Sequence, residues 1–246
     1  MSHAVARLRT ARLAQLTKPF VARGSRAERC PGCRLLPSHC LCALRPVLHA
    51  PTRAGVCLLM GDIEALKPSN TGWLIADVLP DTHAFGWART AVDPALLALL
   101  ADPQWQPYLV FPGEFVAPER VVNSLMPQRA KRPLFVLLDA TWAEARKMFL
   151  KSPYLNHLPV LSLQPDQASN YQLRRSTRDD HLCTSEVAAL CLALAGDAQA
   201  AATLDAYLSV FSQHYLQARA HVPVDLEDAE HQRLRLCTAA HTVAVD

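Results

Sequence analysis

Short apolar runs alternate with helical patterns along most of this 246-residue chain. Five runs predict buried strands because turn formers or prolines flank them: Val56–Met60, His83–Trp87, Tyr108–Phe111, Leu134–Leu138 and Val160–Leu163. Five further stretches predict helices: Thr71–Leu79, Pro94–Ala101, Trp142–Lys151, Ser185–Ala195 and Gln199–Ala218. This alternation predicts an α/β domain with a mainly parallel sheet and helices on both faces.

The charge of the chain is divided unevenly between its two parts. Residues 1–53 carry ten Lys and Arg against one acid, a net charge of +9, whereas residues 54–246 carry fifteen against 21, a net charge of −6. A basic head on an acidic body fits either a polyanionic partner or a solvated tail. We expect a basic N-terminal segment over 1–45, an α/β domain over 46–225 and a C-terminal tail over 226–246.

Glycine usage excludes two nucleotide-binding motifs. The eight glycines are spaced so that neither the dinucleotide pattern G-x-G-x-x-G nor the triphosphate pattern G-x-x-x-x-G-K-[ST] occurs. No apolar stretch reaches the length of a membrane span, so we expect no membrane partner. The first twenty residues lack the apolar region of a signal peptide, which predicts a cytoplasmic protein.

Four of the eight cysteines cluster near the N-terminus as C-x-x-C and C-x-C pairs: Cys30, Cys33, Cys40 and Cys42. Thiolates are preferred ligands of tetrahedral Zn²⁺, and the Pro31-Gly32 turn lets the first pair bind one ion, so we predict a structural zinc knuckle. A reduced metal-free cluster and a dithiol redox centre are the alternatives. Three arginines flank the ligands and suggest contacts with nucleic acid: Arg29, Arg34 and Arg45. The remaining cysteines are most simply core thiols.

The stretch from Pro133 to Lys151 holds the strongest chemical signal. An apolar strand runs into Asp139, and Thr141-x-x-Glu144 has the form of a capping box that begins a helix. A carboxylate at the carboxyl end of a parallel strand lies where open α/β sheets bind ligands. An aromatic side chain in the first helical turn, Trp142, suits stacking on a base or cofactor ring, with core packing as the alternative.

Asp139-Ala140-Thr141-Trp142 resembles the D-x-T-W signature of the DTW-domain family. Four more segments agree in the family's order: the cysteine cluster, Asn70-Thr71-Gly72, Val110-Phe111-Pro112-Gly113-Glu114 and Cys183-Thr184-Ser185-Glu186. Trp73 stands where the family usually has arginine, and Val187 where alanine is usual. The resemblance covers roughly residues 28–220 and rests on five motifs in sequence.

The resemblance implies transfer of the 3-amino-3-carboxypropyl group of S-adenosylmethionine to N3 of a tRNA uridine, with release of methylthioadenosine. It also implies a fold related to the SPOUT type, whose backbone can be knotted. The catalytic candidates are Asp139, as the base for N3 or as a holding group, and Trp142. Cofactor contacts are expected from Leu109, Phe111, Pro112, Thr141, Thr184, Ser185 and Glu186.

Two other functions remain open at this stage: a SPOUT-type RNA methyltransferase and a non-catalytic, zinc-stapled RNA-binding protein. The aminocarboxypropyltransferase and the methyltransferase differ only in which carbon next to the sulfonium faces the nucleophile, and residue types do not separate them. Three arginines in a polar loop add to the basic head as candidate phosphate contacts: Arg174, Arg175 and Arg178. The alternative for them is a solvated loop. The expected partner is tRNA, and no pattern indicates an obligate protein partner.

Overall fold

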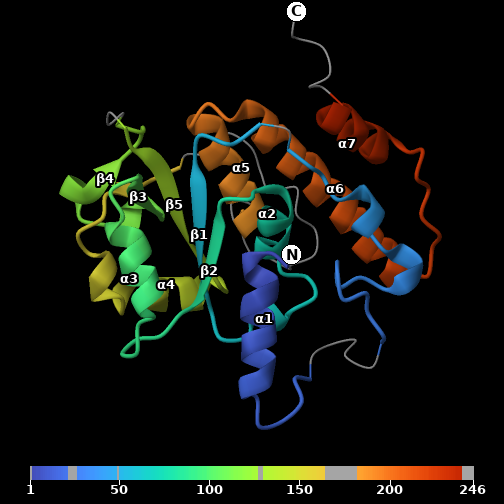
Figure 1. Cartoon of the computed structure of the whole chain (residues 1–246), viewed down its shortest axis with the longest axis horizontal. Helices are drawn as coiled ribbons and strands as arrows, with labels where there is room; N and C mark the ends of the chain where they lie inside the picture. Colours follow the sequence, from blue (N-terminus) through green and yellow to red (C-terminus); the bar gives the residue numbers. More distant parts are fainter. Residues whose placement is uncertain (1, 22–26, 49, 127–129, 164–181, 240–246) are drawn as a thin grey trace, which may run out of the picture.

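The computed structural model describes residues 2–21, 27–48, 50–126, 130–163 and 182–239 (Figure 1). A six-stranded sheet in the order β2-β1-β5-β3-β6-β4 forms its centre, and every neighbouring pair is parallel. The strands are β1 (Gly55–Met60), β2 (Thr82–Gly86), β3 (Trp105–Val110), β4 (Val121–Val122), β5 (Arg132–Asp139) and β6 (Val160–Leu161). The predicted parallel α/β architecture is confirmed.

Helices cover both faces of this sheet. They are α1 (Ala4–Gln15), α2 (Gly72–Val78), α3 (Pro94–Ala101), α4 (Trp142–Leu150), α5 (Thr184–Leu194), α6 (Ala198–Ala220) and α7 (Ala229–Ala239). Six single-turn 3₁₀ segments join them: Pro37–His39, Cys42–Leu44, Glu64–Leu66, Gly113–Phe115, Pro118–Arg120 and Pro153–Leu155. Helices α3 and α4 lie on one face, and α2, α5 and α6 lie on the other (Figure 1).

The two faces follow from the two-residue period of the strands. In β1, Val56 and Leu58 belong to the core under α2, α5 and α6, whereas Cys57 and Leu59 belong to the core under α3 and α4. All six residues of β1 are buried, as expected for a central strand of a doubly covered sheet.

The structure lengthens one predicted strand and adds elements that the sequence did not predict. Strand β3 begins at Trp105 and passes through Pro107, which the sheet tolerates because β6 pairs with β3 only from Leu109 onwards. The two-residue strand β4 is too short to give a sequence signal. Helices α1 and α7 were not predicted, because each buries only two residues and so lacks a long apolar stripe.

The knot that the SPOUT relationship implies stays a prediction, and residues 164–181, between β6 and α5, lie outside the described residues. Among the described residues, no helix is both long and apolar enough to cross a membrane.

Candidate functional site

The Asp139 carboxylate ends β5 at the carboxyl edge of the sheet and is completely buried. Its Oδ2 accepts a hydrogen bond from Asn70 Nδ2 at 2.7 Å, and its Oδ1 accepts one from the Thr184 hydroxyl at 2.6 Å. Both oxygens therefore have neutral donors, which is what a buried carboxylate requires.

Three segments distant in the sequence meet at this carboxylate because the sheet is parallel. The end of β5 supplies Asp139, the loop before α2 supplies Asn70, and the first residue of α5 is Thr184. The Asn70 Oδ1 also accepts from the Trp73 main-chain N–H at 3.2 Å, so this side chain satisfies the first turn of α2 while its amide group faces Asp139. Gly72 leaves the room for this contact, since a Cβ there would lie 2.7 Å from Asp139 Oδ2.

The start of α5 adjoins this carboxylate. Ser185 is buried, its N–H donates to the Thr71 hydroxyl at 3.4 Å, and its own Oγ has no hydrogen-bond partner among the described residues. Glu186 accepts from the Cys183 N–H at 2.7 Å and so caps the helix. Thr184 is half-buried. The Ser185 hydroxyl is thus a buried polar group that lacks a partner among the described residues.

Trp142 begins α4 and is 43% exposed, so core packing does not explain it. Its ring lies 5.7 Å from that of Phe111 and 6.3 Å from that of Phe115, and Phe111 stacks on Phe149 at 4.5 Å. The result is an aromatic surface, open on one side, at the carboxyl edge of the sheet. Such surfaces suit stacking on a planar heterocycle.

The predicted capping box of α4 is confirmed. The Thr141 N–H donates to Glu144 at 3.1 Å, and the Glu144 N–H donates to the Thr141 hydroxyl at 3.4 Å. The hydrogen bond from the Thr141 hydroxyl to the Glu144 carboxylate lowers the pKa of Glu144. Thr141 is exposed and is occupied as a helix cap.

Three of the predicted cofactor contacts lie where β3 ends: Leu109, Phe111 and Pro112. Leu109 and Phe111 are buried in the core of this face, and Pro112 is half-buried. Only the stretch from Phe111 onwards reaches the exposed aromatic surface, since the Leu109 side chain packs inside the sheet.

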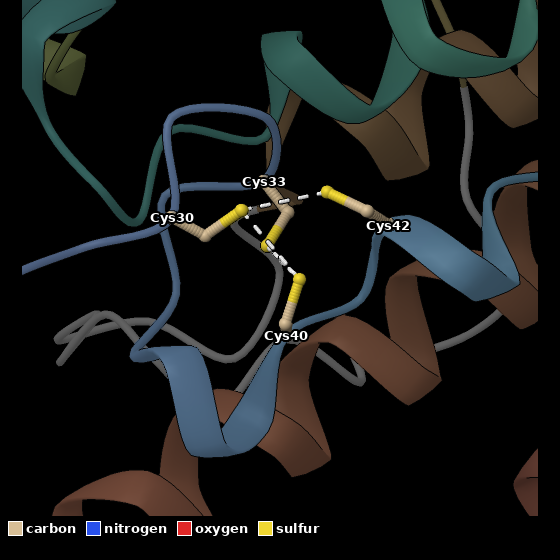
Figure 2. A group of neighbouring side chains, drawn as sticks. All are labelled: Cys30, Cys33, Cys40 and Cys42. Atoms are coloured by element: carbon tan, nitrogen blue, oxygen red, sulfur yellow. Dashed lines mark hydrogen bonds between the residues drawn. The ribbon is translucent and has the colours of Figure 1, made fainter.

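The four N-terminal cysteines converge on one point although they come from two separate turns (Figure 2). Their Sγ atoms all lie within 4.8 Å of one another, with Cys30 at 3.5 Å from both Cys42 and Cys40, and Cys33 at 3.7 Å from Cys40. A tetrahedral zinc ion with Zn–S bonds of about 2.3 Å separates its sulfurs by about 3.8 Å. The four cysteines therefore fit a metal ion such as zinc.

The surroundings of Cys30 favour a thiolate. Burial raises the pKa of this thiol, but hydrogen bonds from the main-chain N–H groups of Cys33 and Gly32 outweigh burial and lower it to about 7. Burial raises the pKa values of Cys33 and Cys42. A set of thiols that share close contacts and one thiolate is the donor set that a divalent ion completes by displacing the remaining protons.

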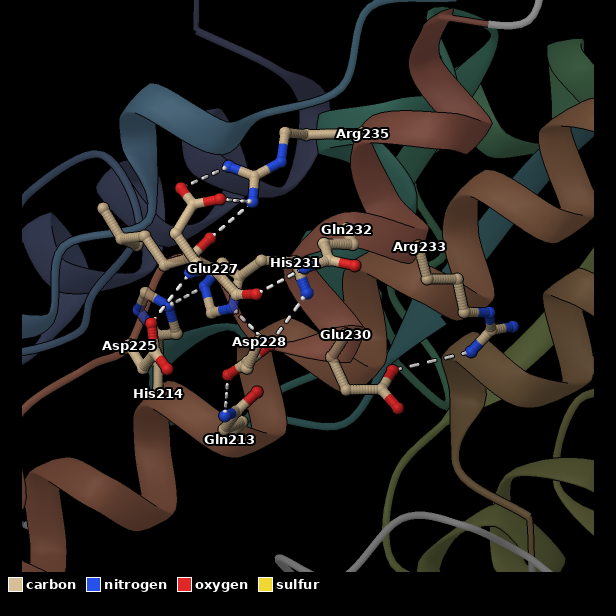
Figure 3. Close-up of polar contacts among 11 residues, drawn as sticks. Gln213, His214, Asp225, Glu227, Asp228, Glu230, His231, Gln232, Arg233 and Arg235 are labelled. Carbon is tan, nitrogen blue, oxygen red and sulfur yellow. Dashed lines mark hydrogen bonds and ion pairs between the residues drawn. The ribbon is translucent and has the colours of Figure 1, made fainter.

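A second polar cluster ties α7 to the body of the protein (Figure 3). His231 in α7 donates through Nδ1 to Asp228 at 2.8 Å and meets His214 of α6 through Nε2 at 2.9 Å, while His214 Nδ1 donates to the His39 carbonyl at 3.1 Å. These contacts link α7 through His231 and His214 to the main chain at His39. Burial lowers the pKa of His214.

The predicted RNA-facing arginines have different environments. Arg45 is exposed but pairs with the Asp77 carboxylate at 2.9 Å, and Arg29 is half-buried and donates to the Arg34 carbonyl at 3.1 Å. Arg34 is only 3% exposed and faces main-chain carbonyls. The prediction that Arg34 contacts phosphate groups is therefore wrong for this conformation. The other three lie outside the described residues: Arg174, Arg175 and Arg178.

Comparison with known families identifies the family of this chain. A family model described as DTW domain matches residues 27–216, which include the cysteine cluster, Asn70, Asp139 and Thr184. The chain belongs to the DTW-domain family. No solved structure matches the chain. Membership in the DTW-domain family indicates a tRNA-related role and suggests a tRNA-modifying transferase.

Two side-chain contacts of the described residues were missed by sequence reasoning. Asn70 was named only as part of a family motif. Its hydrogen bond to Asp139 spans 69 positions, so no local sequence pattern predicts this contact. The Glu64 side chain is buried and pairs with Lys67 at 2.5 Å in the loop that follows β1. A buried glutamate three residues before a lysine is indistinguishable in sequence from an exposed pair on a helix.

Proposed function

We propose that this protein transfers the 3-amino-3-carboxypropyl group of S-adenosylmethionine to N3 of a uridine in tRNA. The observation that carries the proposal is the Asp139 carboxylate, buried at the carboxyl edge of the sheet between Asn70 and Thr184, inside a DTW domain. Neutral donors hold the carboxylate in place, as proton removal by a fixed base requires, and the half-exposed aromatic surface lies at the same edge of the sheet.

The reaction forms one bond and breaks one bond. Uridine N3 bonds to the γ-carbon of the transferred group, the bond from that carbon to sulfur breaks, and methylthioadenosine leaves with the electron pair. The N3 proton needs an acceptor, and Asp139 is too deeply buried for direct contact. We assign a relay to Thr184, whose half-buried hydroxyl accepts the N3 proton while its own hydrogen passes to Asp139 over the 2.6 Å bond.

The reactants need a stacking surface for a base and a polar site for the amino-acid end of S-adenosylmethionine. We assign Trp142 and Phe111 to stacking on a base, since Trp142 is exposed and their rings lie 5.7 Å apart. For the amino-acid end of S-adenosylmethionine we assign Ser185 at the start of α5, because its buried hydroxyl lacks a partner among the described residues. Pro112 borders the same edge, and Thr141 and Glu186 act by capping the helices that carry these groups.

The tRNA is assigned to the basic N-terminal segment. Arg45 and the polar-loop arginines neutralise phosphate groups, so affinity falls steeply as salt concentration rises. The cysteine cluster, when it binds zinc, holds its own turn rigid, and a shell of four thiolates leaves no open position for catalysis. The target uridine must be unstacked for its N3 edge to be reached, which favours a loop of the tRNA.

The test is incubation of the protein with unmodified tRNA and S-adenosylmethionine, followed by mass analysis of the nucleosides. We expect one uridine to gain the aminocarboxypropyl group, with an equal amount of methylthioadenosine. A gain of methyl size would instead identify a methyltransferase, and no gain across a complete tRNA pool would leave an RNA-binding protein.

One matched pair of variants and one further variant test the relay. Thr184→Val should reduce the transfer rate by about 100-fold or more, while Thr184→Ser keeps the hydroxyl and most of the activity. Asp139→Asn should abolish transfer without loss of S-adenosylmethionine binding. Equal rates for Thr184→Val and Thr184→Ser would remove Thr184 from the proton path.

A further inference from the structure

Arg34 occupies an unusual position in the turn of the cysteine cluster. It follows the ligand Cys33 directly and has a φ of 65°, in the left-handed region that residues other than glycine seldom adopt. Its N–H donates to the Cys30 carbonyl at 2.8 Å, and the Cys30 N–H donates to the Leu35 carbonyl at 2.8 Å. The turn that holds two cysteines thus also fixes the direction in which the Arg34 side chain leaves it.

The Arg34 side chain points into the protein and not toward solvent. Its two terminal nitrogens donate to main-chain carbonyls, Nη1 to Lys67 and Nη2 to Asn70 at 3.0 Å. Its guanidinium carbon lies 4.1 Å above the centre of the Trp73 ring. A planar fork of fixed geometry therefore holds the 67–70 loop at both ends.

Asn70 is the residue on which this support converges. Arg34 donates to the main-chain carbonyl of Asn70, while the side-chain amide of Asn70 donates to Asp139 at 2.7 Å. A second link runs in parallel, since Trp73 Nε1 donates to the Gly32 carbonyl at 3.2 Å and the Trp73 N–H donates to Asn70 Oδ1. Two separate contacts thus connect the cysteine turn to the residue that orients the buried carboxylate.

We propose that Arg34 is a positioning residue that transmits the order of the cysteine cluster to the Asn70–Asp139 pair. A metal ion on the four thiolates fixes the turn, the turn fixes Arg34, and Arg34 fixes the loop that presents Asn70. The cluster then supports the transfer step as well as tRNA binding. The kinetic part of this inference rests on the proposed function, whereas its structural part does not.

The structural test follows the Asn70 side-chain amide by NMR in protein labelled with ¹⁵N-asparagine. The chain has four asparagines, so the spectrum is sparse, and the loss of one amide pair in Asn70→Ser assigns Asn70. We expect the Asn70 resonances to shift or broaden in Arg34→Met and in wild-type protein stripped of zinc, and to return when Zn²⁺ is added to the stripped protein. The exposed Asn156 amide serves as the internal control.

The kinetic test separates positioning from RNA contact. Arg34→Met should lower kcat roughly tenfold to 100-fold, as expected for a displaced catalytic group, with KM for tRNA nearly unchanged. Arg34→Lys keeps the charge but not the fork, so it should also lower kcat. Arg235→Met, which removes an exposed arginine of α7 that pairs with Glu227, should match the wild type.

Several outcomes would overturn the proposal. Unmoved Asn70 resonances in a folded Arg34→Met, or a raised KM with normal kcat, would show that Arg34 acts on RNA or on nothing at the site. If Arg34→Met fails to fold, Arg34→Lys and the zinc-stripped wild type give the same measurement. If wild-type protein transfers nothing, the proposed function fails while the NMR result still decides the role of Arg34.

Discussion

Replacing Gly72 by alanine tests how closely α2 approaches the buried carboxylate. The new methyl group would lie 2.7 Å from Asp139 Oδ2 and 3.2 Å from both Asn70 Oδ1 and Leu58 Cδ1. The first distance is about 0.8 Å short of the roughly 3.5 Å optimum for non-bonded heavy atoms. Because Asp139 and Asn70 are both buried, neither can turn away into solvent.

Two opposing effects set the size of the change. Alanine in place of glycine stabilises a helix by about 0.5–1 kcal/mol, whereas overpacking a filled interior costs about 1–3 kcal/mol. We therefore expect Gly72→Ala to lower the free energy of unfolding by about 1–2 kcal/mol. For a domain of this size the midpoint of thermal unfolding should fall by about 2–8 °C. Transfer should fall as well, since the clash displaces Asp139.

The matched control is Gly86→Ala. A Cβ at Gly86 meets only Leu8 Cδ1, at 3.9 Å, which is ordinary van der Waals contact. Its free energy of unfolding in urea should stay within about 0.5 kcal/mol of the wild type. A Gly72→Ala protein as stable and as active as Gly86→Ala would refute the close packing of α2 against Asp139.

Three further predictions concern the periphery of the site. Burial, opposed by Arg45, raises the pKa of Asp77 to about 6, so ionising Asp77 costs the folded state. The free energy of unfolding should fall by on the order of 2–3 kcal/mol as pH rises from about 4 to 6, and urea titrations of Asp77→Asn should lack this fall. Gly32→Ala would place a methyl group 2.6 Å from Cys42 Sγ, so metal analysis should find less zinc per chain than in the wild type. His231→Gln removes the ring that joins α7 to α6, and hydrogen exchange of the α7 amides should accelerate by roughly tenfold or more, equivalent to about 1–3 kcal/mol.

The sequence predicts the parts of this fold that rest on local apolar pattern. All five predicted strands are present, because buried parallel strands read as continuous apolar runs. Helix α3 has the predicted bounds, since Asp93 caps it and Pro94 begins it. Helix α7 was missed for the opposite reason: polar contacts of His231 attach it to the body, and polar residues carry no periodic signal.

The same division applies to the site. Asp139 and Trp142 could be predicted from the sequence because Asp139 ends an apolar strand and Trp142 begins a helix. Arg34 was assigned to solvent and phosphate, since an arginine beside a metal ligand in a basic segment has the same sequence appearance whether it points outward or inward. Only the left-handed turn decides the direction, and no residue pattern predicts a positive φ at an arginine.

That neither glycine-rich nucleotide-binding motif occurs in the sequence fits the way Asp139 is held. A phosphate-binding loop needs successive glycines because main-chain N–H groups must approach the ligand closely. Here side chains provide the donors, Asn70 from a loop and Thr184 from a helix start, and one glycine, Gly72, gives the clearance. Side-chain donors at a buried carboxylate must themselves be held, which is what Arg34 and the cysteine turn do for Asn70. A site built this way depends on its distant supports more than a glycine loop does, so variants at these supports should affect it although they lie far from Asp139 in sequence.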